Sequence, residues 1–183
     1  REQGQGDLAG EIALVPHGGY GRRDLAPYSD ADIMLLYHSG VRKRIQPFVK
    51  KFVGELWNAG IEPGFNPRTP VDACSLAQGD PKIFTSLVES RFLAGSVKVY
   101  RQFISRLRRG TRGRRGRLIE AITAARRTER SQYGGTVYLL EPNVKRSPGT
   151  LRDLQLLRWV AFARYGESDP GFLRSVGVLT RMD

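Results

Sequence analysis

The first third of the chain combines short apolar runs with one helical pattern. Residues 11–16 form a short apolar run suited to a buried strand, and residues 31–37 form a second and stronger one. Between residues 41 and 57 apolar side chains recur at helical spacing, and Pro47 marks either a kink or the start of this amphipathic helix. Residues 61–68 are short and rich in proline and glycine, which predicts an edge strand returning to the sheet.

From residue 69 onward the pattern is helical. Thr69-Pro70 and Asp80-Pro81 each place an N-capping side chain before a proline, an arrangement typical of the first helical position. Helices are predicted at residues 70–78, 81–91, 96–109, 115–132 and 149–165. A half with strands followed by a helical half predicts an α+β fold.

The composition shift near residue 80 suggests two domains. We expect a mixed sheet-and-helix domain over residues 1–79 and a bundle-like helical domain over residues 80–183, truncated at its C-terminal end. The chain opens on Arg1 rather than methionine, so we expect it to be a piece of a longer protein.

Bulk composition narrows the class of protein. Of the 183 residues 40% are hydrophobic and 26% charged, which is ordinary for a globular protein. No apolar run approaches the length of a membrane span. The single cysteine, Cys74, cannot form an internal disulfide, which fits a cytoplasmic location.

The net charge of +12 is concentrated in one region. Residues 101–130 contain eleven arginines against two glutamates, which suits either a phosphate-rich or acidic partner or a solvated helical face. We favour the solvated face, because this region lacks the interleaved aromatic side chains of a single-strand nucleic-acid platform. Nucleic-acid binding therefore stays the less favoured reading.

The candidate chemistry lies between the first two strands. Asp30 and Asp32 are two residues apart at the second strand, so their carboxylates face the same side and can hold Mg²⁺. Gly18-Gly19 predicts a turn whose backbone can approach a phosphate closely. Ser29 and Arg22 can add a hydroxyl and a guanidinium to phosphate oxygens. This combination predicts a metal-dependent phosphoryl or nucleotidyl transfer site.

Two sequence blocks carry a resemblance to a known family. The first, GGYGRRDLAPYSDAD at residues 18–32, followed by an apolar strand, resembles the signature of the DNA polymerase β-like nucleotidyltransferase superfamily. The second, LEPNVKRSPGTLRDLQ at residues 140–155, is similar to a block of bacterial protein-PII uridylyltransferases. The segments LWNAG at 56–60, Arg68-Thr69 and RFLAG at 91–95 agree with the same family.

This resemblance implies a function and a set of site residues. It implies a polymerase-β-like nucleotidyltransferase domain in which Asp30 and Asp32 hold magnesium and Gly18 and Gly19 line the triphosphate. The nucleotide would be UTP and the acceptor a tyrosine hydroxyl of the nitrogen-regulatory protein PII. Members of the superfamily commonly use a third carboxylate, for which Glu62 is the candidate, with an exposed edge-strand role equally open.

Further assignments extend into the helical half. Lys145 and Arg152 are candidates to reach phosphate from there, with a surface or helix-capping role equally open. His17 lacks neighbours at metal-ligand spacing, so we favour a structural role for it. The family's phosphohydrolase needs adjacent His-Asp ligands, and neither of the two histidines is followed by aspartate, so we expect the uridylyl-removing and regulatory parts to be absent from this sequence.

Departures from the family pattern keep alternatives open. Arg23-Asp24 stands where family members usually have Gly-Glu, and residues 65–67 replace a His-Ser-Val stretch. The alternatives are an adenylyltransferase acting on a protein such as glutamine synthetase, a basic nucleic-acid-binding module, and a nucleotide sensor without transfer activity.

Overall fold

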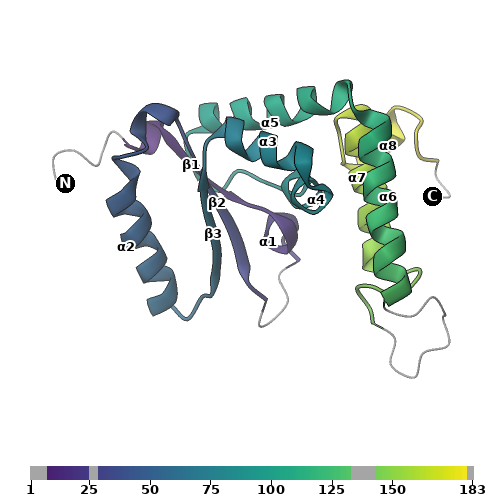
Figure 1. The fold of residues 1–183 in the computed structure, drawn as a ribbon, viewed down its shortest axis with the longest axis horizontal. Coiled ribbons are helices and arrows are strands. Elements are labelled where there is room, and N and C mark those ends of the chain that lie inside the picture. Colours follow the sequence, from purple (N-terminus) through teal and green to yellow (C-terminus); the bar gives the residue numbers. More distant parts are fainter. Residues whose placement is uncertain (1–7, 25–28, 133–142, 181–183) are drawn as a thin grey trace. The chain divides into compact units, whose positions relative to one another are not determined.

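The computed structural model describes residues 8–24, 29–132 and 143–180. The chain forms two compact units, residues 1–107 and residues 108–183, and we describe each by itself (Figure 1). The first unit contains η1 (Leu8–Gly10), β1 (Ile12–Pro16), α1 (Gly18–Arg22), β2 (Ala31–Tyr37), η2 (Ser39–Val41), α2 (Ile45–Asn58), β3 (Pro63–Arg68), α3 (Pro70–Gly79), α4 (Pro81–Val88) and β4 (Ala94–Gly95). Helix α5 (Val97–Arg112) crosses the division, and the second unit continues with α6 (Arg115–Gln132), α7 (Leu151–Tyr165) and α8 (Pro170–Ser175).

The sheet of the first unit is mixed, with strand order β3-β2-β1-β4. Strand β2 pairs antiparallel with β1 and parallel with β3, so the strongest apolar run of the sequence lies at the centre. In the parallel pairing Asp32 lies opposite Gly64 and Met34 opposite Asn66. The predicted strands and the edge position of β3 are confirmed, and so is the α+β class.

Helix α2 covers one face of this sheet, and α1, α3 and α4 lie on the other (Figure 1). Ile45 at the start of α2 is buried with Leu35 and Tyr37 of β2, and Phe48 and Phe65 pack against this cluster. Because side chains alternate along a strand, Asp32 and Met34 point to the opposite face, toward α4. The hydrophobic cluster beneath α2 thus fills one face of the sheet, and the Asp32 side chain lies on the other face.

The second unit is held together by the packing of α6 against α7. Ile122 of α6 and Trp159 and Phe162 of α7 are buried there. Pro170 begins α8, whose N-cap residue Asp169 accepts a hydrogen bond from the N–H of Phe172.

Two local expectations were wrong, and two short elements were not predicted. The Gly18-Gly19 pair begins helix α1 instead of forming a simple turn. Helix α4 ends at Val88 instead of residue 91, because the N–H groups of Arg91 and Leu93 donate to carbonyls of β1. That pairing leads into β4, which the sequence pattern did not predict, and α8 was also missed.

The compact units divide between Leu107 and Arg108. Helices α3 and α4 pack with the sheet in the first unit, whereas the composition shift near residue 80 suggested a domain boundary at 79/80. The functional division at that point stays a prediction. No helix in the described part of the chain combines the length and the apolar character needed to cross a bilayer.

Candidate active site

The site begins where β1 ends and α1 starts. Gly18 has φ +55°, a left-handed conformation that glycine adopts without a side-chain clash. A Cβ at this position would stand 3.0 Å from Asp32 Oδ2 and 3.4 Å from Ser86 Oγ. The missing side chain therefore lets the start of α1 approach the Asp32 carboxylate and helix α4.

The Asp32 carboxylate lies between two glycines. Its Oδ2 faces Gly18, and its Oδ1 lies 2.6 Å from the place where a Cβ on Gly64 would stand. The Asp32 C=O accepts the N–H of His17 at 3.0 Å, which continues the β1–β2 pairing to this point. The backbone of three segments thus surrounds one half-buried carboxylate.

His17 connects this carboxylate to α4. A hydrogen bond of 2.8 Å joins His17 Nδ1 and Ser86 Oγ. Burial lowers the pKa of His17; the Asp32 carboxylate opposes this shift, and the Arg68 guanidinium reinforces it. The imidazole therefore lies within electrostatic reach of both Asp32 and Arg68.

Asp30, Ser29 and Glu62 lie at the start of the two parallel strands. Asp30 and Ser29 precede β2 and are exposed, and Glu62 precedes β3 and is exposed. The N–H of Ala31 donates to the Glu62 carbonyl at 3.0 Å, which places Glu62 beside the start of β2. The role of Glu62 as a third carboxylate stays a prediction.

Arg22 and Arg23 end helix α1 in different conformations. The Arg22 Nε donates to Asp24 Oδ2 at 3.0 Å, so this guanidinium has a carboxylate partner within the motif. Arg23 forms the C-cap with φ +67°, and it is the one non-glycine residue with positive φ in the described part of the chain. Where the family usually has glycine, this chain therefore places an arginine in a left-handed conformation.

The donor set fits a magnesium ion in its chemistry. Mg²⁺ prefers carboxylate oxygens and is commonly held by one or two carboxylates together with substrate phosphates. Asp30 and Asp32 supply two such groups from positions two residues apart, and the absence of side chains at Gly18 and Gly64 lets the backbone approach the Asp32 carboxylate closely. Within residues 8–24, 29–132 and 143–180 no group of three or more His, Cys, Asp or Glu side chains is placed to hold a metal.

Lys145 and Arg152 belong to the second unit, apart from the other candidates in sequence. The Arg152 guanidinium donates to Gln155 Oε1 at 2.9 Å, lies 3.5 Å from Glu129 Oε1 and stacks over Trp159. The Lys145 carbonyl accepts the N–H of Arg152 at 3.1 Å. These contacts fit the structural alternative for Arg152, while phosphate binding by the pair stays a prediction.

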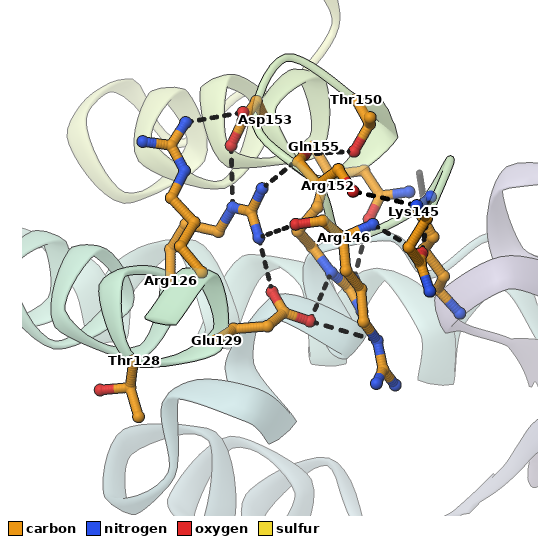
Figure 2. A network of polar contacts seen from close by, with 12 residues as sticks. Arg126, Thr128, Glu129, Lys145, Arg146, Thr150, Arg152, Asp153 and Gln155 are labelled. Carbon is orange, nitrogen blue, oxygen red and sulfur yellow. Dashed lines mark hydrogen bonds and ion pairs between the residues drawn. The ribbon is translucent and has the colours of Figure 1, made fainter. Parts of the chain in front are cut away.

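A buried arginine organises the same region (Figure 2). Arg126 donates to Asp153 Oδ1 at 2.8 Å, to Glu129 Oε2 at 3.1 Å and to the carbonyls of Arg146 and Ser147. Arg130 also pairs with Asp153, at 2.7 Å. Two arginines of residues 101–130, Arg126 and Arg130, thus have carboxylate partners within the second unit. Their charges are partly neutralised there, which weakens the case for a continuous basic surface that binds nucleic acid.

Three residues that line this site lie outside the sequence motif. The hydrogen bond between His17 and Ser86 is compatible with the structural role expected for His17, and the sequence pattern singles out neither Gly64 nor Ser86. Asn66 and Arg68 share the Asp32 face because β3 runs parallel to β2 at a two-residue alternation. The alternation of Gly64, Asn66 and Arg68 along the predicted strand indicates in the sequence that these residues share one face. Only the parallel register with β2 shows that this is the face of Asp32.

Comparison with known proteins supports the resemblance over most of the chain. Residues 117–183 match the family model of GlnD PII-uridylyltransferase. The chain is 38% identical over 156 residues to the bifunctional uridylyltransferase/uridylyl-removing enzyme of Burkholderia orbicola, and 38% identical over 157 residues to that of Burkholderia thailandensis. Each alignment covers 85% of this chain and 18% of the relative, so the chain spans less than a fifth of the length of these relatives.

The second block on which the resemblance is based, residues 140–155, lies within the segment that matches the family model, although residues 140–142 lie outside the described residues. Sequence motif, fold class and comparison agree. The chain is therefore related, over 85% of its length, to one segment of the bacterial PII-uridylyltransferase family.

Proposed function

We propose that this chain carries the nucleotidyltransferase site of a PII uridylyltransferase, which transfers UMP from UTP to a tyrosine hydroxyl of a PII-type signal protein. The observation that carries the proposal is the placement of the Asp32 carboxylate between Gly18 and Gly64, two residues after Asp30 in the sequence. This arrangement occurs in a segment that is 38% identical to enzymes named for uridylyl transfer.

In this proposal Asp30 and Asp32 hold Mg²⁺, which would neutralise charge on the phosphates and on the leaving group. Gly18 and Gly19 open helix α1, and the His17 side chain makes no capping hydrogen bond to the helix start. The first N–H groups of a helix have no partner within it, so here they can donate to phosphate oxygens. Ser29 and Arg22 add a hydroxyl and a guanidinium, with Arg22 held by Asp24.

The transfer itself exchanges the phosphoanhydride bond between the α- and β-phosphates for a phosphoester bond to the tyrosine. The tyrosine oxygen forms a bond to the α-phosphorus of UTP and loses its proton to solvent, while the bond from the α-phosphorus to the bridging oxygen breaks and pyrophosphate leaves. The residues of this chain would hold the triphosphate in the orientation in which the tyrosine oxygen can reach the α-phosphorus. Glu62, Lys145 and Arg152 are further candidates for this work.

A titration of UTP, ATP, GTP and CTP, with and without magnesium, tests the proposal. We expect magnesium-dependent preference for UTP, loss of this binding in Asp32→Asn, and unchanged binding in the control Glu55→Gln, whose side chain is exposed on α2. Transfer of labelled UMP to a PII-type protein should follow the same pattern. Preference for ATP would favour the adenylyltransferase alternative, and the absence of nucleotide binding would overturn the proposal.

A further inference from the structure

A pocket of about 240 Å³ lies against the Asp32 face of the sheet. Its wall is formed by Met34 of β2, Asn66 and Arg68 of β3, Lys82 and Ser86 of α4, and His17. These residues come from four segments of the chain, so the pocket exists only in the folded first unit. None of them belongs to the Gly-Gly and aspartate motif at residues 18–32, which His17 immediately precedes.

Two cations, Arg68 and Lys82, line the pocket together with the apolar side chains of Met34, Ile83 and Leu87. Arg68 is half-buried, and neither Arg68 nor Lys82 forms an ion pair with another described residue. Two cations that face one pocket repel each other, and the partial burial of Arg68 makes its charge costly. An anion bound between them would relieve both effects, and phosphate oxygens match the donors of arginine and lysine.

His17 links this pocket to the Asp32 carboxylate. The imidazole lines the pocket, and its Nδ1 shares a hydrogen bond of 2.8 Å with Ser86 Oγ. The backbone N–H of His17 donates to the Asp32 carbonyl at the end of the β1–β2 pairing. Asp32 Oδ2 and Ser86 Oγ both lie beside Gly18, 3.0 Å and 3.4 Å from the place where a Cβ would stand. An elongated anion that begins beside Asp32 and Gly18 therefore has the pocket next to it.

We infer that Arg68 and Lys82 form a subsite for the β- and γ-phosphates of the nucleoside triphosphate, with Ser86 and His17 at its entrance. The inference rests on the proposed function for the identity of the occupant. It adds two cations outside the sequence motif to the groups that hold the leaving pyrophosphate. Both would act by binding the triphosphate tail, so they would affect the affinity for any nucleoside triphosphate, whatever its base.

Calorimetric titration of the 183-residue chain with inorganic tripolyphosphate, without magnesium, tests this subsite. Each charged contact to phosphate contributes on the order of tenfold in affinity, so Arg68→Gln and Lys82→Gln should each weaken binding by about that factor. The matched control is Lys98→Gln, which removes an exposed lysine of α5 away from the pocket and should leave the affinity unchanged. Circular dichroism checks that each variant is folded, and Lys82→Gln at an exposed position keeps the test valid if Arg68→Gln does not fold.

A second probe separates the phosphate tail from the base. Uridine lacks phosphate and should not displace tripolyphosphate. Displacement by uridine, or equal tripolyphosphate affinity in the wild type and in both pocket variants, would overturn the inference. Neither result depends on transfer activity or on the choice of UTP over ATP, so failure of the subsite is distinguishable from failure of the proposed function.

Discussion

Asp32 lies directly opposite Gly64 in the parallel pairing of β2 and β3, and its carboxylate occupies the space that a side chain at residue 64 would need. The distance from Asp32 Oδ1 to the position of a Cβ on Gly64 is 2.6 Å, well inside van der Waals contact. A glycine at this position therefore sets the orientation of the Asp32 carboxylate. It also means that a third carboxylate cannot come from the position on β3 that faces Asp32.

The change Gly64→Ala tests this relationship. The added methyl group should push the Asp32 carboxylate aside while leaving the fold intact, since the obstructing atom is the end of a side chain. We expect UMP transfer to fall on the order of tenfold to a hundredfold, because small displacements of a catalytic group have effects of that size. Transfer rates and thermal unfolding of the variant measure the two effects separately.

The control for this substitution is Gly54→Ala. Gly54 lies in α2, and a Cβ there would meet no other atom within 4 Å. Alanine should stabilise the helix by about 0.5–1 kcal/mol and leave transfer unchanged. If Gly64→Ala behaved like this control, the orientation of Asp32 would have no bearing on activity.

Local signals allowed much of the fold to be predicted. The Thr69 hydroxyl accepts the N–H of Asp72, and Asp80 caps α4, as expected from the residues that precede each proline. Helix α2 begins at Ile45, so Pro47 falls in its first turn, where proline is tolerated. Caps and proline positions act over a few residues, so the sequence alone is enough to place them.

Elements fixed by distant contacts could not be predicted in the same way. Residues after Val88 leave the helix because they pair with β1, more than 70 positions earlier in the chain. In the candidate site Asp32 could be predicted from its motif, whereas its partner Gly64 and the pocket residue Ser86 depend on strand register and helix packing. The motif therefore predicts a candidate carboxylate, whereas the residues that surround it follow only from the fold.

Arg23→Gly should stabilise the first unit. A left-handed conformation costs a non-glycine residue roughly 1–2 kcal/mol, and Arg23 has φ +67° at the end of α1. Glycine removes this cost but adds unfolded-state entropy, so we expect a net gain of about 0.5–1 kcal/mol in urea denaturation. Arg42→Gly is the control, because Arg42 has φ −49° and glycine should bring no gain there. A loss of stability in Arg23→Gly would show that the arginine side chain outweighs its backbone strain.

Arg126→Met should destabilise the second unit by about 3 kcal/mol or more. The Arg126 side chain is 3% exposed and donates to Asp153, Glu129 and two backbone carbonyls, so its removal leaves buried acceptors without a donor. Urea denaturation gives the free energy of unfolding. The neighbouring exposed residue provides the control Arg127→Met, which should change stability by less than about 0.5 kcal/mol. Equal effects of the two substitutions would contradict a structural role for the Arg126 network.

Asp153 makes the stability of the second unit depend on pH in the acid range. Burial raises the pKa of its carboxyl, but hydrogen bonds from Arg126, Arg130 and the N–H of Gly149 outweigh burial and lower the pKa from 3.8 to about 2. Because the folded-state pKa lies below the unfolded one, the carboxylate contributes stability above about pH 4. That contribution is lost as the pH falls through 2.

The measurement is the difference in unfolding free energy between the wild type and Asp153→Asn at several pH values. At pH 6 we expect the wild type to be more stable by about 1–3 kcal/mol, and the difference should shrink between pH 4 and pH 2 as the wild-type carboxylate takes up a proton. Taking the difference removes the contribution of the other carboxyl groups, which titrate in both proteins. If the difference in unfolding free energy stayed constant down to pH 2, the negative charge of Asp153 would not contribute to the packing of α6 against α7. Its shape and its neutral hydrogen bonds would then account for the effect of the substitution.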